Sequence, residues 1–182
     1  MSIRRVLRIK AVVQGLWILL FVSGCGPRSG LNPGEVAPYF AMKDLTGRNV
    51  SRDDLEGKAT VLCFWASWCE PCIKELPALE RLHSILSSRG GRVIGIGIDD
   101  SRKNLAKIIA KEGVTFPVLL DESGLAKQRY QVKGVPETFL LNSRNRIVAL
   151  VGGGGKLEVR LTGPREWDDP HTVELLTSSL GL

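Results

Sequence analysis

Two cysteines separated by two residues, Cys69 and Cys72, carry the clearest chemistry in this sequence. They lie in Trp68-Cys69-Glu70-Pro71-Cys72, between a continuous apolar run (residues 60–65) and a helical pattern. A buried strand that leads directly into a helix places the first cysteine at the helix N-terminus. There, free backbone N–H groups and the helix dipole stabilise a thiolate. The second sulfur then lies one turn further on, so the pattern indicates reversible thiol–disulfide exchange, with Cys69 attacking and Cys72 resolving.

Other uses of a cysteine pair fit this sequence less well. An inert structural disulfide is disfavoured because so tight a loop at a helix start is a poor staple. A zinc site needs two more ligands, and the remaining candidates show no paired spacing: Cys25, Cys63, His83 and His171. A c-type haem attachment needs histidine directly after the second cysteine, where this chain has Ile73. We therefore expect no metal and no cofactor beyond the redox-active disulfide itself.

The segments around the motif alternate between strand and helix patterns. The apolar runs 60–65 and 92–98 are typical of strands buried on both faces. Apolar residues at three- and four-residue spacing after Cys69 predict a helix that is kinked at Pro77 and ends at Gly90-Gly91. Further strands are expected at 115–120, 137–142 and 146–151, and further helices from Ser101, at 124–130 and at 170–180.

A hairpin is expected ahead of this alternation. Residues 39–45 and 48–51 flank the turn Thr46-Gly47, and a short capped helix follows at 51–55. Strands that alternate with helices, followed by a hairpin over 137–151, predict an α/β protein. The expected architecture is a three-layer sandwich with a mixed central sheet and this N-terminal hairpin added to it.

The first 24 residues have the pattern of a secretory signal peptide. Their basic residues (Arg4, Arg5, Arg8 and Lys10) supply four of the six formal net positive charges, and the near-neutral remainder argues against nucleic acid as a partner. The apolar run 11–24 is 14 residues long, whereas about 20 are needed to span a membrane as a helix. This length favours a cleaved signal, with a transmembrane anchor as the alternative.

The quartet Val22-Ser23-Gly24-Cys25 resembles the bacterial lipoprotein box. That resemblance implies cleavage before Cys25 and attachment of lipid to its sulfur; an ordinary signal peptide that contains a cysteine is the alternative. Residues 25–34 are rich in glycine and proline and are expected to form a tether. The expected organisation is signal peptide 1–24, lipid-anchored tether 25–34 and one folded domain 35–182, in the bacterial cell envelope.

The motif and its surroundings resemble the thioredoxin-like proteins of the TlpA/ResA/CcmG type. The resemblance is carried by residues 64–77, by the block Gly134-Val135-Pro136-Glu137-Thr138-Phe139 and by the segment from Gly163 to Trp167. It implies a thioredoxin-like fold and a membrane-tethered protein that reduces disulfides of envelope proteins. Several members of this family serve cytochrome c maturation. The resemblance further implies a membrane thiol electron donor and attachment to membrane lipid.

Three more site residues follow from this resemblance. The Val135–Pro136 bond is expected to be cis and to pair the backbone with an extended partner segment; a trans proline in a loop is the alternative. Glu75 matches an acid that assists proton movement, with a solvated surface glutamate as the alternative. Trp68 would shield the disulfide, or simply pack. One departure from the family pattern is a glycine run, 152–155, followed by a strand-like run, 156–162, of unknown function.

The sequence also bears on whether the protein reduces or oxidises its partners, and on two rival functions. The carboxylate of Glu70 disfavours a thiolate at Cys69, which favours a reductant. A peroxiredoxin would carry proline seven residues and threonine or serine three residues before its reactive cysteine, but this chain has Leu62 and Ala66 there. The rival from another class is a thioredoxin-fold copper-handling protein. Such proteins add a histidine or methionine ligand to a thiol pair.

Overall fold

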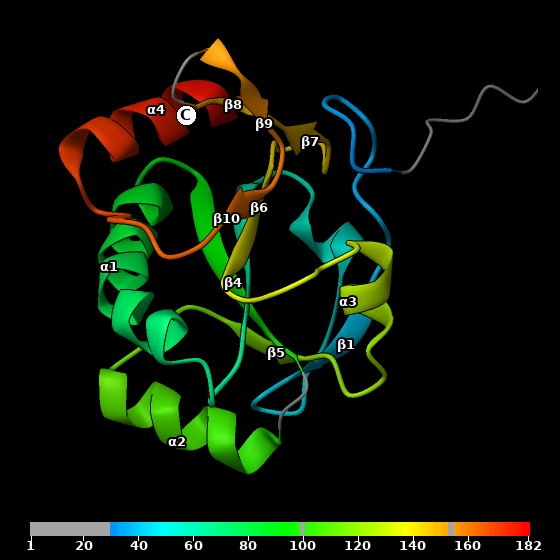
Figure 1. Ribbon diagram of the computed structural model, residues 1–182. Helices are drawn as coiled ribbons and strands as arrows, with labels where there is room; N and C mark the ends of the chain where they lie inside the picture. Colours follow the sequence, from blue (N-terminus) through cyan, green and yellow to red (C-terminus); the bar gives the residue numbers. More distant parts are fainter. Residues whose placement is uncertain (1–29, 99–100, 153–154) are drawn as a thin grey trace, which may run out of the picture.

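The computed structural model of the protein describes residues 30–98, 101–152 and 155–182 (Figure 1). The expected signal peptide (residues 1–24) and Cys25 lie outside these residues. The elements in chain order are β1 (Ala41–Asp44), β2 (Asn49–Ser51), a 3-10 helix (Arg52–Leu55), β3 (Ala59–Trp65), α1 (Glu70–Ser87), β4 (Gly91–Gly97), α2 (Arg102–Glu112), β5 (Val118–Leu120), α3 (Leu125–Arg129), β6 (Glu137–Leu141), β7 (Ile147–Val148), β8 (Leu150–Val151), β9 (Leu157–Glu158), β10 (Leu161–Thr162) and α4 (Pro170–Leu180).

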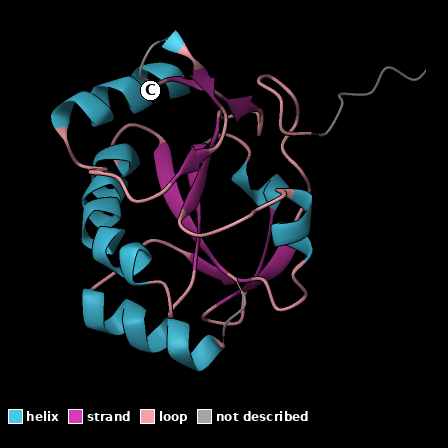
Figure 2. Ribbon diagram, in the orientation of Figure 1, coloured by secondary structure: helices cyan, strands magenta, loops and turns pink. Residues whose placement is uncertain are grey.

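The central sheet is mixed. Its strand order is β10-β6-β3-β4-β5-β1-β2, with β7 paired to β6. The pairs β3–β4 and β4–β5 are parallel, whereas β6, β10 and the β1–β2 hairpin join antiparallel. Figure 2 shows helices on both sides of this sheet. The structure confirms the expected α/β sandwich with a mixed sheet.

Strand β3 contacts the helices on both sides of the sheet. All seven of its residues are buried, and successive side chains point to opposite faces. Val61 and Cys63 belong to the core cluster beneath α1, α2 and α4, whereas Phe64 belongs to the cluster with α3 and the 3-10 helix. A strand covered on both faces needs an unbroken apolar sequence. This requirement is what the apolar run of residues 60–65 satisfies.

Three boundaries differ from the sequence-based expectation, each for a local reason. Helix α1 continues through Pro77 but ends at Ser87, because Gly90 (φ +83°) turns the chain so that Gly91 already pairs with Ala59. Strand β5 begins at Val118 rather than at Thr115, whose backbone N–H instead donates to Glu80 Oε2 of α1 at 2.7 Å. The run expected over residues 156–162 is split between two strands, β9 and β10.

These two strands belong to different sheets. Strand β9 pairs with β8 in a small separate sheet, whereas β10 pairs with β6 in the central sheet. The chain therefore leaves the central sheet after β7 and returns to its edge at β10, next to the strand that follows Pro136.

The described part of the expected tether lies against the domain. Gly30 N–H donates to the Val36 carbonyl at 3.0 Å, and Gly34 N–H donates to the Ile147 carbonyl at 2.8 Å. Arg146 Nη1 donates to the Gly34 carbonyl at 2.7 Å. Over the described ranges, no helix combines the length and the apolar character that crossing a membrane requires.

Candidate active site

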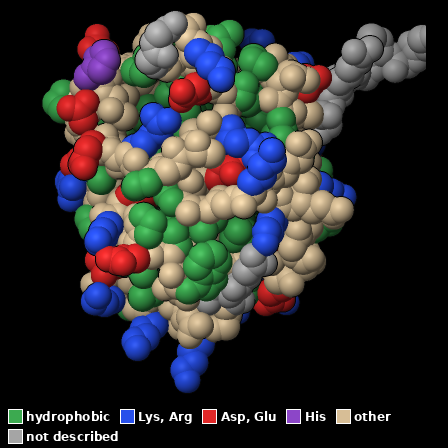
Figure 3. All heavy atoms as spheres, viewed as in Figure 1, with side chains coloured by type: hydrophobic (Ala, Val, Ile, Leu, Met, Phe, Trp, Pro, Cys, Tyr) green, Lys and Arg blue, Asp and Glu red, His purple; other side chains and the backbone are tan. Residues whose placement is uncertain are grey.

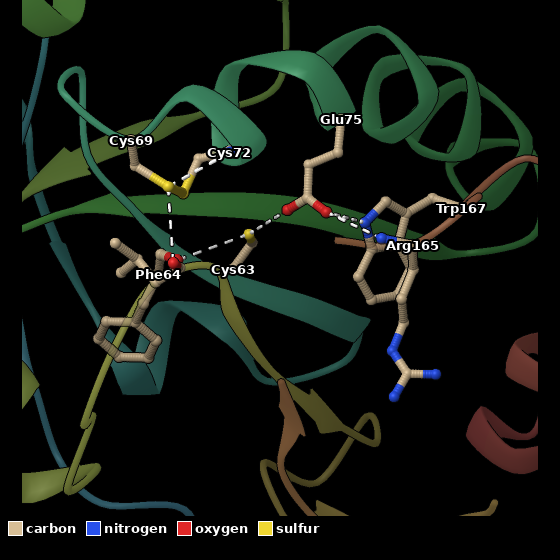
Figure 4. Close-up of a disulfide and its surroundings, with 8 residues drawn as sticks. Cys63, Phe64, Cys69, Cys72, Glu75, Arg165 and Trp167 are labelled. Carbon is tan, nitrogen blue, oxygen red and sulfur yellow. Dashed lines mark hydrogen bonds between the residues drawn. A yellow bond between two sulfur atoms is a disulfide. The ribbon is translucent and has the colours of Figure 1, made fainter. Parts of the chain in front are cut away.

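The two cysteines of the motif form a disulfide at the start of α1. Their sulfurs are 2.10 Å apart and their Cα atoms 5.3 Å apart. Cys69 is the N-cap residue, and its Sγ accepts a hydrogen bond from the backbone N–H of Cys72 at 3.3 Å. Pro71 occupies the first turn, where no hydrogen-bond donor is lost. The helix N-terminus therefore offers a free backbone N–H group, that of Cys72, to the sulfur of Cys69, as the sequence predicts (Figure 4).

The two sulfur-bearing residues differ in how far solvent reaches them. Cys69 is 5% exposed, whereas Cys72 is 0% exposed. Trp68 precedes them and is 63% exposed, so it does not pack in the core. It lines a groove of about 450 Å³ together with Glu70, Ile73, Lys74, Pro77, Lys111 and Glu112. Figure 3 shows hydrophobic side chains gathered around the start of α1, with acidic and basic side chains about them.

The loop before β6 lies against the same sulfur. The Val135–Pro136 peptide bond is cis, as the resemblance implies. The Val135 carbonyl oxygen lies 3.5 Å from Cys69 Sγ, and the Pro136 carbonyl accepts a hydrogen bond from Gly163 N–H at 3.0 Å. The structure thus brings together Cys69 and Pro136, which are far apart in the sequence.

Glu75 is a buried residue of the site and not a solvated surface glutamate. Its side chain extends from α1 toward the sheet (Figure 4), and the residue is 4% exposed. Its Oε2 accepts hydrogen bonds from Trp167 Nε1 at 3.0 Å and from the backbone N–H of Arg165 at 3.2 Å. Burial raises the pKa of this carboxyl above its ordinary value, although these donors oppose the shift.

Cys63 is a second partner of this carboxylate. It lies on β3, is buried and takes no part in a disulfide, and its Sγ is 3.6 Å from Glu75 Oε1. Burial and the nearby carboxylate raise the pKa of the Cys63 thiol, so it stays protonated and donates to Glu75. From its place in the middle of the apolar run 60–65, the sequence predicts only an inert buried residue at Cys63. Twelve residues separate Cys63 from Glu75, and no periodic pattern spans a strand and the helix that follows it.

The outer face of α1 carries a different carboxylate. Glu70 pairs with Lys74, one turn along the helix, at 2.7 Å, and both side chains are mostly exposed. Lys74 lowers the pKa of Glu70 and also compensates its charge at Cys69. The sequence-based argument that Glu70 makes the protein a reductant is therefore weaker than the spacing suggests. The second glutamate of this part of the helix, Glu75, is buried, so water screens its charge less than that of Glu70.

Within residues 30–98, 101–152 and 155–182, no group of three or more histidine, cysteine or acidic side chains is arranged to hold a metal ion. His83 lies on α1, and its Nδ1 accepts a hydrogen bond from the backbone N–H of Val93 at 3.1 Å. That nitrogen is therefore engaged by β4.

Comparisons with known proteins agree with this geometry. The AhpC/TSA family matches residues 33–150. The thiol–disulfide oxidoreductase ResA of Bacillus subtilis is 32% identical over 126 residues, which cover 69% of this chain and 70% of ResA. A thiol:disulfide interchange protein of the thioredoxin family from Chlorobium tepidum superposes with a TM-score of 0.64 at 26% identity, covering 82% of this chain and 98% of that one. StoA from Bacillus subtilis superposes with a TM-score of 0.58 at 28% identity, covering 80% and 98%.

Two residues before Cys69 argue against a peroxidase. Leu62 and Ala66 occupy the positions where a peroxidase would carry proline and threonine or serine, and both are fully buried apolar residues. The cysteine pair at a helix start, the cis-proline loop beside it and the identity to ResA all agree with one another. The chain belongs to the AhpC/TSA family of thioredoxin-fold proteins and is a thiol–disulfide oxidoreductase of the ResA type.

Proposed function

We propose that the protein reduces disulfides of other envelope proteins, with Cys69 as the attacking thiol and Cys72 as the resolving thiol. The unequal exposure of the two cysteines at the start of α1 carries this assignment. Only a sulfur that a partner can reach can form a mixed disulfide, and of the two Cys69 alone has measurable exposure. Its sulfur also accepts a hydrogen bond from the Cys72 N–H at the helix start, which favours its thiolate.

The reduction takes two exchange steps. In the first, the Cys69 thiolate attacks a substrate disulfide, the substrate S–S bond breaks, and one substrate sulfur leaves as a thiolate and takes up a proton. In the second, the Cys72 thiol gives its proton to Glu75, and its sulfur attacks Cys69 in the mixed disulfide. The second substrate thiolate leaves, and the two electrons have passed from the Cys69–Cys72 dithiol to the substrate. A thiol donor at the membrane then restores the dithiol.

Glu75 supports the reducing direction. A buried carboxylate three residues after Cys72 on the same helix disfavours a thiolate at Cys72, because two negative charges repel each other strongly where water is excluded. A dithiol whose thiolate is disfavoured is less stable relative to its disulfide, and it therefore donates electrons more readily. The resemblance to the TlpA/ResA/CcmG type directs this activity to cytochrome c maturation, so an oxidised Cys-x-x-Cys-His peptide is the first substrate to test.

The place of the reaction follows from the N-terminus. A signal peptide over residues 1–24 and lipid on Cys25 would hold the domain at a membrane on its extracytoplasmic side. Disulfides persist in that compartment and need enzymes that reduce selected ones. Labelling with radioactive palmitate of the wild type and of Cys25→Ala tests this anchor. Loss of the label in Cys25→Ala supports it, and equal labelling contradicts it.

The decisive experiment traps the intermediate. In cells that express Cys72→Ser, the second step is blocked, so mixed disulfides with partner proteins accumulate through Cys69. Cys69→Ser is the matched control and traps none, because its remaining thiol is buried. Non-reducing gels followed by identification of the adducts provide the measurement. Equal trapping by both variants, or trapping by neither, contradicts the assigned roles.

A further inference from the structure

The segment that departs from the family pattern contacts the active-site loop through one side chain. Arg160 lies between β9 and β10, beyond the glycine run, and its side chain is 26% exposed. Its guanidinium donates to the carbonyl of Gln131 at 2.5 Å and to that of Tyr130 at 3.3 Å. It also pairs with the carboxylate of Glu137 and lies over the ring of Phe139.

Glu137 extends this network into the loop that carries Pro136. It directly follows that proline, and its side chain is 1% exposed. One carboxylate oxygen pairs with Arg160, while the other, Oε2, accepts a hydrogen bond from the backbone N–H of Lys133 at 3.3 Å. The ion pair thus contacts the loop 131–136 at Gln131 and at Lys133. Glu137 itself is the residue that follows this loop.

Backbone hydrogen bonds from Val132 N–H to the Lys127 carbonyl and from Gly163 N–H to the Pro136 carbonyl hold the ends of this loop, and the Arg160–Glu137 pair adds contacts at Gln131 and Lys133. Residues 131–136 form no helix or strand. Gln131 has φ +52°, a left-handed conformation that is unfavourable for a residue with a side chain. The guanidinium binds the carbonyl of that residue. At the other end of the loop, the Val135 carbonyl lies 3.5 Å from Cys69 Sγ. Any displacement of the loop would move the backbone that faces the reacting sulfur.

We propose that Arg160 is a positioning residue for the protein substrate: through Glu137 and the carbonyls of Tyr130 and Gln131, it holds the backbone before Pro136 in the place where a substrate segment docks beside Cys69. The inference rests on the proposed function, because it assigns a role within disulfide exchange with a polypeptide. The proposal also assigns a role to the segment after the glycine run, because this segment carries Arg160.

Arginine suits this role for a geometric reason. Its planar guanidinium presents five donors in a fixed fork, so it can bind a carboxylate and two carbonyl oxygens at once. Lysine offers one compact ammonium, which can pair with Glu137 but cannot also hold both carbonyls. Arg160→Lys therefore separates the charge of the side chain from its bracing geometry.

The test compares a peptide substrate with a small reagent. The peptide is an oxidised Cys-x-x-Cys-His peptide, and the small reagent is dithiothreitol, which reduces the Cys69–Cys72 disulfide without needing the docking backbone. For Arg160→Ala we expect KM for the peptide to rise about tenfold, while kcat and the rate with dithiothreitol change less than about twofold. Arg160→Lys should fall between Arg160→Ala and the wild type.

Two further variants exclude a purely structural explanation. Arg160→Gln/Glu137→Gln removes the unpaired buried carboxylate that would destabilise Arg160→Ala, and its KM should still be raised because no guanidinium binds the two carbonyls. Arg48→Ala is the matched control, since Arg48 pairs with the buried Asp44 at the opposite edge of the sheet, and its KM should equal that of the wild type.

The possible results are distinguishable. An unchanged KM in folded Arg160→Ala, or an equal loss with peptide and dithiothreitol, overturns the positioning role and leaves the proposed function standing. Failure of the wild type to reduce the peptide, despite normal reaction with dithiothreitol, contradicts the proposed substrate class instead.

Discussion

The first two turns of α1 have an outer and an inner face, and each face bears one glutamate. The pKa values of these two glutamates are shifted in opposite directions. On the outer face, Glu70 is exposed and paired with Lys74, which lowers its pKa. On the inner face, Glu75 is buried beside Cys63 and Trp167, and burial raises its pKa. Five positions along one helix thus separate a solvated carboxylate with a lowered pKa from a buried carboxyl with a raised pKa.

This difference separates two tasks. The outer face, with Trp68 and its groove, is exposed, whereas the inner face bears the glutamate that, in the proposed mechanism, takes the proton of the buried Cys72. A substitution on the inner face should therefore alter the chemical step, and one on the outer face should leave it almost intact. Three predictions test this division.

The largest effect is expected from Glu75→Gln. Cys72 is fully buried, so its thiol needs a nearby proton acceptor before it can attack, and Glu75 lies three residues on along the same helical face. The amide keeps the size of the side chain but cannot take a proton. We expect the release of substrate from the mixed disulfide to slow roughly a hundredfold, measured by single-turnover quenching with the oxidised peptide.

The first step provides the internal control for this variant. Formation of the mixed disulfide depends on Cys69, so its rate should stay close to that of the wild type. In the wild type, the second step should accelerate as pH rises through the raised pKa of Glu75, and the variant should lose that dependence. A second step that keeps the same pH profile in Glu75→Gln would sink the assignment of Glu75 as proton acceptor.

An intermediate effect is expected on stability. Because the pKa of Glu75 is raised in the folded protein, the unfolded chain loses this proton first as pH rises above the ordinary value of 4.5. The folded state then binds more protons than the unfolded state, and the free energy of unfolding falls with increasing pH. Glu75→Gln lacks this contribution. Relative to the variant, the oxidised wild type should lose stability above pH 4.5, until the folded pKa is passed.

Urea unfolding of the two oxidised proteins at a series of pH values measures this difference. Groups common to both proteins cancel, including Cys63 and Arg165, which face the same carboxylate. If wild-type stability instead increased relative to Glu75→Gln over this range, the pKa of Glu75 would be lowered by its hydrogen bonds and not raised by burial.

The start of α1 was predictable from the sequence, because its features are local. The apolar run before Cys69, the two-residue spacing to Cys72 and the proline of the first turn all act over a few residues, and the structure reproduces them. Helix α4 likewise spans the expected residues 170–180, because Asp169 caps its start and Gly181 takes a left-handed conformation at its end.

The inner face was less predictable, because its contacts join distant parts of the chain. Trp167 lies 92 residues from Glu75, and Arg160 lies 23 residues from Glu137. Contacts over such separations depend on the strand order of the sheet and on the return of the chain at β10. No local sequence pattern predicts either feature. The resemblance to a family supplied Glu75 and Pro136 as candidates, but only the fold shows which donors surround Glu75.

The smallest effect is expected from Glu70→Gln on the outer face. Removal of this carboxylate leaves Lys74 without its partner and takes one negative charge away from the region of Cys69, both of which favour the Cys69 thiolate. Water and salt screen exposed charges well, so alkylation of reduced Cys69 at neutral pH should accelerate less than about threefold. Lys74→Gln leaves the charge of Glu70 uncompensated and should shift the rate slightly in the opposite direction. A tenfold or larger acceleration in Glu70→Gln would mean that the outer carboxylate, and not Glu75, controls the reactivity of the pair.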